Sequence, residues 1–224
     1  MLQVNKKKYF NLHTHQFTNQ EDVLELVNQY PWEFNEIIPY YSIGIHPWYI
    51  NEDRFDADLQ LIEQKLALNN CLALGECGLD KRIEIPLETQ INVFKAQIFL
   101  AEKFQKPLVL HCVAAFQEVI QIKKELNIKV PLIIHGFSKN KPTAKQLLDN
   151  GFYLSFGKYL LRNPELKTVF QSVPNDRFFL ETDTIEESLE EVYALAANYK
   201  NCEIEEIKAI VVSNFEKVFQ FKQI

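Results

Sequence analysis

The feature that most constrains the fold is a repeated alternation of short apolar segments with longer amphipathic ones. The short segments are continuously apolar rather than alternately apolar and polar, which is typical of strands buried on both faces of a sheet. The predicted strands are residues 9–12, 39–45, 71–74, 107–110, 131–134, 152–156 and 178–180. A series of such strands, each separated from the next by an amphipathic stretch, indicates a parallel sheet.

The intervening stretches carry apolar residues near helical spacing. The predicted helices are residues 21–30, 55–68, 88–104, 115–126, 141–150, 163–172, 186–198 and 203–219. Gly151 directly follows one of them and is typical of a helix stop. The pattern therefore predicts one α/β domain over residues 1–224, because barrels of about 200–250 residues are common as single domains.

The predicted fold is a (β/α) TIM-type barrel, with an open doubly wound sheet as the alternative. Seven strands are clear, and an eighth is sought in residues 32–38. Pro31 and Pro39 crowd that segment, so we expect the second βα unit to be irregular or reduced.

Composition and charge exclude several classes of protein. The net charge is −6, which argues against a basic protein that coats nucleic acid. It leaves a nuclease open, because bound cations supply local positive charge. No apolar run approaches the roughly 20 residues of a membrane span, and no apolar region follows the lysines near the start, so no signal peptide is expected. Four cysteines without a C-x-x-C pair predict free thiols in a reducing cytoplasm.

Chemically active side chains lie at or just beyond the ends of the predicted strands. They are His13, His15, His46, Glu76, His111, His135 and Asp183. In a (β/α) barrel the carboxyl ends of all strands meet on one face, where active sites lie. These residues, distant in sequence, are therefore expected to converge.

Six of these residues together predict a site for divalent metal ions. His13 and His15 point to the same side of an extended segment, so both can bind one ion. Either His111 or His135 alone would more often be a satisfied core histidine, and Asp183 alone suits the start of a helix. Glu76 lies between glycines at a strand end, where burial is costly unless the carboxylate is paired or bound to metal. Four histidines and two carboxylates at one level match two ions, and a carboxylate can bridge them.

The other candidates are given different roles. His46 follows a strand end, and we interpret it as a pocket wall or phosphate contact rather than a metal ligand. Cys77 and Cys112 neighbour predicted ligands, but adjacent strand residues point to opposite faces, so they are predicted to pack rather than to act as nucleophiles.

The order and spacing of these motifs resemble the TatD family of metal-dependent deoxyribonucleases, within the amidohydrolase-like barrels. The resemblance runs over nearly the whole chain. The matching segments are residues 13–15, 44–47, 75–80, 107–111, 135–137 and 181–183, with Gln90, Phe94 and Gln97 at helical spacing and Asn214 to Phe219 at the end.

The resemblance implies a function and a role for each ligand. It implies that His13, His15 and Asp183 hold one metal, that His111 and His135 hold the second, and that Glu76 bridges them. The cofactors would be two divalent ions such as Mg²⁺, Mn²⁺ or Zn²⁺. The implied reaction is hydrolysis of phosphodiester bonds at DNA ends, in which Asp183 orients the attacking water or accepts its proton.

The sequence departs from the family pattern around the ligands. Val113 stands where the family often has a basic residue, Gln16-Phe17 replaces Leu-Asp, and Thr184-Ile185 replaces Pro-Tyr. Basic residues of the strand-end loops can substitute as phosphate contacts, with solvated surface charge as the alternative. They are Lys81, Arg82, Lys139, Lys158 and Arg162.

Two other functions stay open at this stage. The same ligands would serve an amidohydrolase or lactonase acting on a small molecule, although such enzymes often use a carboxylated lysine where this chain has Glu76. The chain could instead be a metal-binding scaffold without activity, but six ligands without a use are costly to keep satisfied. No acidic or basic tail indicates a protein partner.

Overall fold

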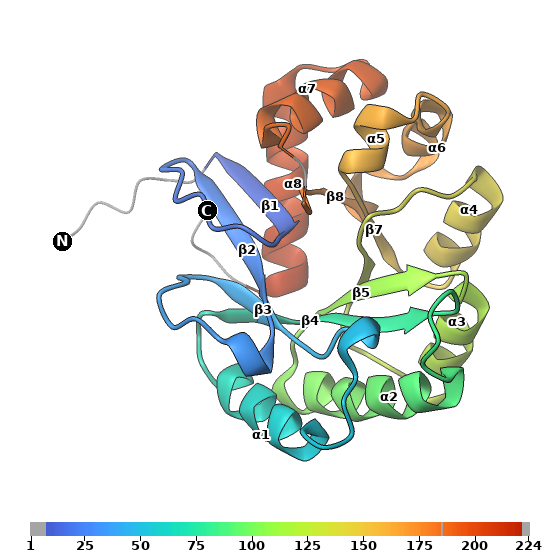
Figure 1. Ribbon diagram of the computed structural model, residues 1–224. Coiled ribbons are helices and arrows are strands. Elements are labelled where there is room, and N and C mark those ends of the chain that lie inside the picture. The colour runs from blue at the N-terminus through green and yellow to red at the C-terminus, as the bar shows by residue number, and fades with distance from the viewer. Residues whose placement is uncertain (1–7, 185, 221–224) are drawn as a thin grey trace. The chain divides into compact units, whose positions relative to one another are not determined.

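The computed structural model describes residues 8–184 and 186–220 (Figure 1). Its strands form one eight-stranded sheet in the order β1 to β8. The strands are β1 (Tyr9–Thr14), β2 (Val23–Gln29), β3 (Tyr41–Ile43), β4 (Cys71–Asp80), β5 (Leu108–Val113), β6 (Leu132–Ile134), β7 (Tyr153–Phe156) and β8 (Phe178–Leu180). Five of the pairings between neighbours are parallel ladders: β1–β2, β3–β4, β4–β5, β5–β6 and β7–β8.

Helices follow each strand from β3 onward. They are α1 (Phe55–Leu66), α2 (Leu87–Phe104), α3 (Phe116–Glu125), α4 (Lys141–Asp149), α5 (Lys158–Arg162), α6 (Leu166–Ser172), α7 (Leu189–Lys200) and α8 (Ile204–Phe219), with short 3₁₀ helices η1 (Pro31–Glu33), η2 (Pro47–Tyr49) and η3 (Asn175–Arg177). Sequential parallel strands alternating with helices define an α/β fold of the (β/α) TIM-barrel type, as predicted.

The chain divides into two compact units. The first contains residues 1–27, 136–149 and 153–224, and the second contains residues 28–135 and 150–152. In the first unit β1 and β8 are neighbours, because Thr14 and Asp183 form a parallel bridge. The single domain expected over the whole chain stays a prediction, and the positively charged start of the chain lies outside the described residues.

Most elements match their predicted positions, including Gly151, which follows α4 with φ at +78°. The prediction of a helix over residues 21–30 is wrong, because this segment forms β2. The prediction of an eighth strand over residues 32–38 is also wrong, since η1 lies there. The expected reduction of the second βα unit is confirmed: among the described residues, no α-helix precedes α1.

The polar residues of β2 explain the wrong helix assignment. In an amphipathic helix these residues would form the solvent-exposed face, but here they are buried with specific partners. The Glu25 carboxylate accepts hydrogen bonds from the Thr18 backbone and hydroxyl, the latter at 2.6 Å, and from the Asn19 backbone. Asn28 Oδ1 accepts the Glu76 N–H at 2.7 Å. Buried polar groups that are satisfied in this way fit a two-sided strand.

Aromatic packing joins α8 to the strands of the first unit. Phe215 packs against Phe10 with ring centroids 4.4 Å apart and stacks on Phe219 at 5.0 Å. Beside them the buried Asn214 amide donates to the carbonyls of Asn175 and Phe178, at 2.8 and 2.9 Å. This amide ties α8 to the start of β8, which carries the chain toward Asp183.

None of the helices that the structure describes is both long enough and apolar enough to cross a membrane. The cytoplasmic location stays a prediction.

Asn214→Ala should lower the free energy of unfolding by about 1–3 kcal/mol, because the carbonyls of Asn175 and Phe178 would lose their donor. Urea unfolding followed by circular dichroism measures the change. Asn198→Ala is the matched control, since Asn198 is exposed on α7. Equal losses in the two variants would contradict a specific role for the Asn214 amide.

Candidate metal centre

The first unit brings together three predicted ligands. His13 is fully buried at the end of β1, and its Nε2 lies 3.9 Å from Asp183 Oδ1. His15 Nε2 lies 3.6 Å from the same oxygen, and the two imidazole rings are perpendicular with centroids 5.0 Å apart. One ligand atom from each residue lies within 4.8 Å of the others. Two imidazoles and a carboxylate at this spacing fit one divalent ion.

Backbone hydrogen bonds hold this cluster together. The Asp183 N–H donates to the His13 carbonyl at 2.9 Å, and the His15 N–H donates to the Asp183 carbonyl. Below them the Asn11 amide and Thr182 exchange two hydrogen bonds, at 2.8 and 3.1 Å. Asp183 itself has φ at +57°, a left-handed conformation that is uncommon outside glycine and is often found at functional sites.

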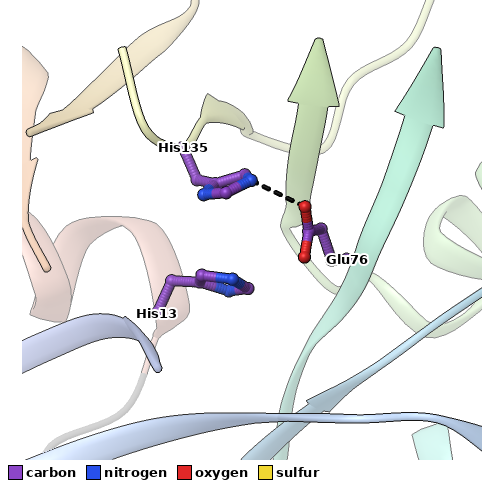
Figure 2. Close-up of side chains that lie close together, drawn as sticks. All are labelled: His13, Glu76 and His135. Atoms are coloured by element: carbon purple, nitrogen blue, oxygen red, sulfur yellow. Dashed lines mark hydrogen bonds and ion pairs between the residues drawn. The ribbon is translucent and has the colours of Figure 1, made fainter. Parts of the chain in front are cut away.

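In the second unit, three imidazoles converge on one carboxylate oxygen. Glu76 Oε1 lies 2.7 Å from His135 Nε2, 2.9 Å from His111 Nδ1 and 3.2 Å from His46 Nε2. Figure 2 shows the His135 ring nitrogen directed at this oxygen. The Glu76 side chain is only 4% exposed, so the carboxylate depends on these contacts rather than on water.

Two glycines let the backbone that carries Glu76 lie against β5. β4 continues to Asp80, beyond the predicted end at residue 74, so Glu76 lies inside a strand rather than after one. A Cβ atom on Gly78, where φ is +136°, would lie 2.1 Å from the His111 carbonyl oxygen. On Gly75 it would lie 2.5 Å from the Val109 carbonyl oxygen. Only glycine allows this approach, which places Glu76 beside His111.

His46 belongs to the same cluster, but its hydrogen bonds make Nε2 a hydrogen-bond donor. Its Nδ1 accepts the Trp48 N–H at 3.1 Å, so the proton of the neutral ring is on Nε2, the nitrogen facing Glu76. Burial lowers the pKa of His46 below its ordinary value, against the opposing effect of Glu76, and so favours the neutral ring. An N–H that faces the site can donate to a substrate oxygen. His46 also lies close enough to Glu76 and His111 for the three side chains to hold an ion, which would require the proton to leave Nε2.

Asp80 is a site residue that the sequence analysis did not single out. Its Oδ2 lies 3.2 Å from His111 Nε2 and accepts the Trp48 indole N–H at 2.8 Å. Burial alone would raise the pKa of Asp80, but hydrogen bonds from Trp48, Arg82 and His111 outweigh it and keep the pKa below its ordinary value. A carboxylate on one ring nitrogen of a histidine fixes the tautomer that leaves the other nitrogen free to bind metal. The only sequence signal was its place in the motif of residues 75–80.

Two glutamines of α2 fix the strand ends that carry these groups. The Gln97 side chain accepts the Ile45 N–H at 2.8 Å and donates to the Ile45 carbonyl, next to His46. Gln90 makes the same two-way contact with the backbone of Asp80, at 2.8 and 3.0 Å. The helical spacing of these glutamines in the sequence is thus explained by their contacts with two strand ends.

The cysteines near the site do not have the character of nucleophiles. Cys77 is fully buried, and burial holds the pKa of its thiol well above the ordinary value. Burial likewise raises the pKa of Cys71 to about 12. A thiol that stays protonated is a poor nucleophile, in agreement with a packing role.

The chain belongs to the TatD-related DNase family, whose model matches residues 3–220. It is 35% identical over 149 residues to the uncharacterized metal-dependent hydrolase YabD of Bacillus subtilis, a match that covers 64% of this chain. It is 29% identical over 173 residues to the 3′-5′ ssDNA/RNA exonuclease TatD of Erwinia tasmaniensis, covering 73% of this chain. The chain spans 58% of the length of the first relative and 62% of the second.

Solved structures support the fold. The TatD homologue YjjV of Escherichia coli K12 matches with a TM-score of 0.82 at 20% identity, covering 96% of this chain and 99% of that one. A TatD family hydrolase of Entamoeba histolytica matches with a TM-score of 0.79 at 17% identity, covering 96% and 98%. At these identities the likeness establishes the barrel fold alone.

Asp80→Asn should weaken divalent-metal binding by about 10–100-fold, because His111 would lose the carboxylate that orients it. Calorimetric titration of the metal-stripped protein with Mn²⁺ or Zn²⁺ measures the affinity. Asp58→Asn is the matched control, since Asp58 is a buried carboxylate paired with Arg54 instead of a histidine. Unchanged affinity in Asp80→Asn, with the fold retained, would contradict the orienting role.

Proposed function

We propose that this chain is a divalent-metal-dependent phosphodiesterase that releases nucleotides from DNA ends. The observation that carries the proposal is the convergence of His46, His111 and His135 on one buried oxygen of Glu76. An isolated anion at this depth is costly unless it is paired with or bound to a cation. A bound divalent cation would balance the carboxylate and use the imidazole nitrogens as ligands.

The ligand roles follow the donor sets of the two clusters together with the family resemblance. In the first unit His13, His15 and Asp183 would hold one ion, and in the second unit Glu76, His111 and His135 would hold another. Mixed imidazole and carboxylate donors admit Mg²⁺, Mn²⁺ or Zn²⁺. When bound, such ions lower the pKa of water and offset charge on phosphate oxygens.

The protein's own groups then divide the remaining work. Asp183, with 21% of its side chain exposed, orients the attacking water and accepts its proton. His46 donates its Nε2–H to a phosphate oxygen and thereby fixes the scissile bond against the site. The role of His46 uses the tautomer that its contact with the Trp48 N–H favours.

Nucleic acid is the preferred substrate class because the Erwinia relative carries the name of an ssDNA/RNA exonuclease. Among the basic residues predicted to contact phosphate, two are already paired. Lys81 pairs with Glu118, and Arg162 forms a two-oxygen contact with Glu187 at 3.0 and 3.1 Å. Arg82, Lys139 and Lys158 stay predicted contacts, and Lys158 lines a cavity of about 460 Å³ next to Thr184.

Wild-type protein in Mg²⁺ or Mn²⁺ should release nucleotides from an end-labelled single-stranded DNA oligomer. Glu76→Ala and Asp183→Ala should each reduce the rate by about 10²-fold or more, since each removes a metal ligand. Gel analysis of oligomers labelled at either end measures the rate and shows which end is attacked. Asp176→Ala, an exposed carboxylate in η3, is the control and should keep full activity.

The failure of this experiment would be informative. A wild-type protein that binds metal and leaves DNA intact would contradict the substrate assignment, and small esters, lactones and amides would then be tested for the amidohydrolase alternative. A wild-type protein that binds no divalent ion would contradict the proposal entirely.

His46→Gln should raise KM for the oligomer by about 10–100-fold while metal stoichiometry stays unchanged, because a hydrogen bond to a charged oxygen is lost and no metal ligand is. Steady-state kinetics and metal analysis by mass spectrometry are the two measurements. A loss of bound metal in this variant would show that His46 is a ligand and not a substrate contact.

A further inference from the structure

Four aromatic residues of the second unit lie near His46 and are here called the aromatic platform: Tyr30, Trp32, Trp48 and Tyr49. Tyr30 and Trp32 are stacked, with centroids 5.0 Å apart and planes inclined by 10°. Tyr49 meets both edge-on, at 5.3 and 5.8 Å. Trp48 precedes Tyr49 in η2, two residues after His46.

The platform is exposed where it adjoins the candidate site. Trp48 is 52% exposed and Tyr49 is 44% exposed, although both are large and largely apolar. Trp48 lies 5.7 Å from the His111 ring and 5.1 Å from the His46 ring, and Tyr49 lies 5.6 Å from His46. An exposed aromatic surface continuous with a site is typical of a binding surface.

Polar contacts hold the rings in place despite their exposure. The Trp48 indole donates to Asp80 at 2.8 Å, and so shares its acceptor with His111. The Arg54 guanidinium lies 3.8 Å above the Trp32 ring and donates to the Tyr49 carbonyl at 2.7 Å. Rings fixed before binding lose little conformational entropy when a flat ligand stacks on them.

We propose that the aromatic platform stacks unpaired bases of a single-stranded nucleic acid and so feeds its end to the site beside His46 and His111. The inference rests on the proposed function and adds the surface that would hold the strand. Every base has a π-face, so aromatic side chains bind a strand without reading its sequence. Bases inside a duplex are already stacked on one another and do not offer that face. Arg54 covers the Trp32 ring and is paired with Asp58 at 2.8 Å, so the surface offers the exposed rings of Trp48 and Tyr49 rather than an unpaired cation.

The chain's two tryptophans, Trp32 and Trp48, both belong to the platform, so its tryptophan fluorescence reports on this surface alone. Titration with a ten-nucleotide oligo-dT in Ca²⁺, with intactness of the strand checked on gels, should quench this fluorescence to saturation. An abasic strand of the same length should bind roughly fivefold to a hundredfold more weakly, the range expected for lost stacking. The Trp32→Phe variant leaves Trp48 as the sole reporter and should still be quenched.

Anisotropy of a labelled oligo-dT gives affinity independently of the tryptophans. Tyr49→Ala should weaken binding of oligo-dT by roughly fivefold to a hundredfold. It should also reduce the ratio between the affinities for oligo-dT and for the abasic strand. Phe99→Ala is the matched control, since Phe99 is 63% exposed on α2 and lies outside the platform. It should leave both affinities unchanged.

Different outcomes overturn different statements. Oligo-dT that binds without quenching, or no more tightly than the abasic strand, would overturn the platform and leave the proposed function standing. A blunt duplex that quenches as strongly as oligo-dT would overturn the preference for unpaired bases. If oligo-dT neither binds nor is cleaved while bis(p-nitrophenyl) phosphate is hydrolysed in Mn²⁺, the assignment of DNA as substrate is contradicted. The proposed role of the platform is then contradicted as well.

Discussion

The second unit is organised around the buried carboxylate of Glu76, on which three imidazoles converge within 3.2 Å. Such a contact needs a backbone that approaches β5 more closely than a side chain allows, which Gly75 and Gly78 permit. It also needs the Glu76 N–H to be satisfied, which Asn28 does from β2. The glycines, the buried amide of β2 and the histidines are therefore parts of one arrangement, since each is required by the position of the carboxylate.

The two units position their candidate ligands by the same physical means. In the second unit, the side-chain amides of Gln90 and Gln97 each bond to both the N–H and the carbonyl of a residue at a strand end, Asp80 and Ile45. In the first unit, the Asn11 side-chain amide accepts the Thr182 N–H and donates to the Thr182 hydroxyl. Without these hydrogen bonds the strand ends would be more mobile, and the side chains they carry would be held less precisely. Amide side chains that pair with both backbone groups keep the ends rigid without adding charge near the site.

The sequence predicted those parts of the fold whose signal is local. Seven strands were visible as apolar runs and most helices as periodic ones. β2 was not recognised as a strand, because Glu25 and Asn28 resemble the polar face of a helix until their partners at Thr18 and Glu76 are known. The extension of β4 through Glu76 to Asp80 was hidden for a related reason, since glycine and buried acid interrupt an apolar pattern.

The candidate site shows the same division. Its histidines and acids were selected by residue type and by position at strand ends, which a sequence displays. The roles of Asp80 and Trp48 depend on contacts across 31 and 32 residues, and no local pattern encodes them. The donor character of His46 depends on which ring nitrogen the Trp48 N–H reaches.

The aromatic platform would compensate for the positive charge that this chain lacks relative to the family pattern. Val113 lacks the charge that the family often places near its ligands, and Lys81 and Arg162 are neutralised by acidic partners. The chain has a net charge of −6, and two of its five predicted phosphate contacts are paired with acids, which limits counterion release, the usual source of affinity for nucleic acid. Stacking on Trp48 and Tyr49 supplies an attraction that does not depend on charge. It acts on the bases of the strand, and so leaves the phosphate free for His46 and the metal ligands beside it.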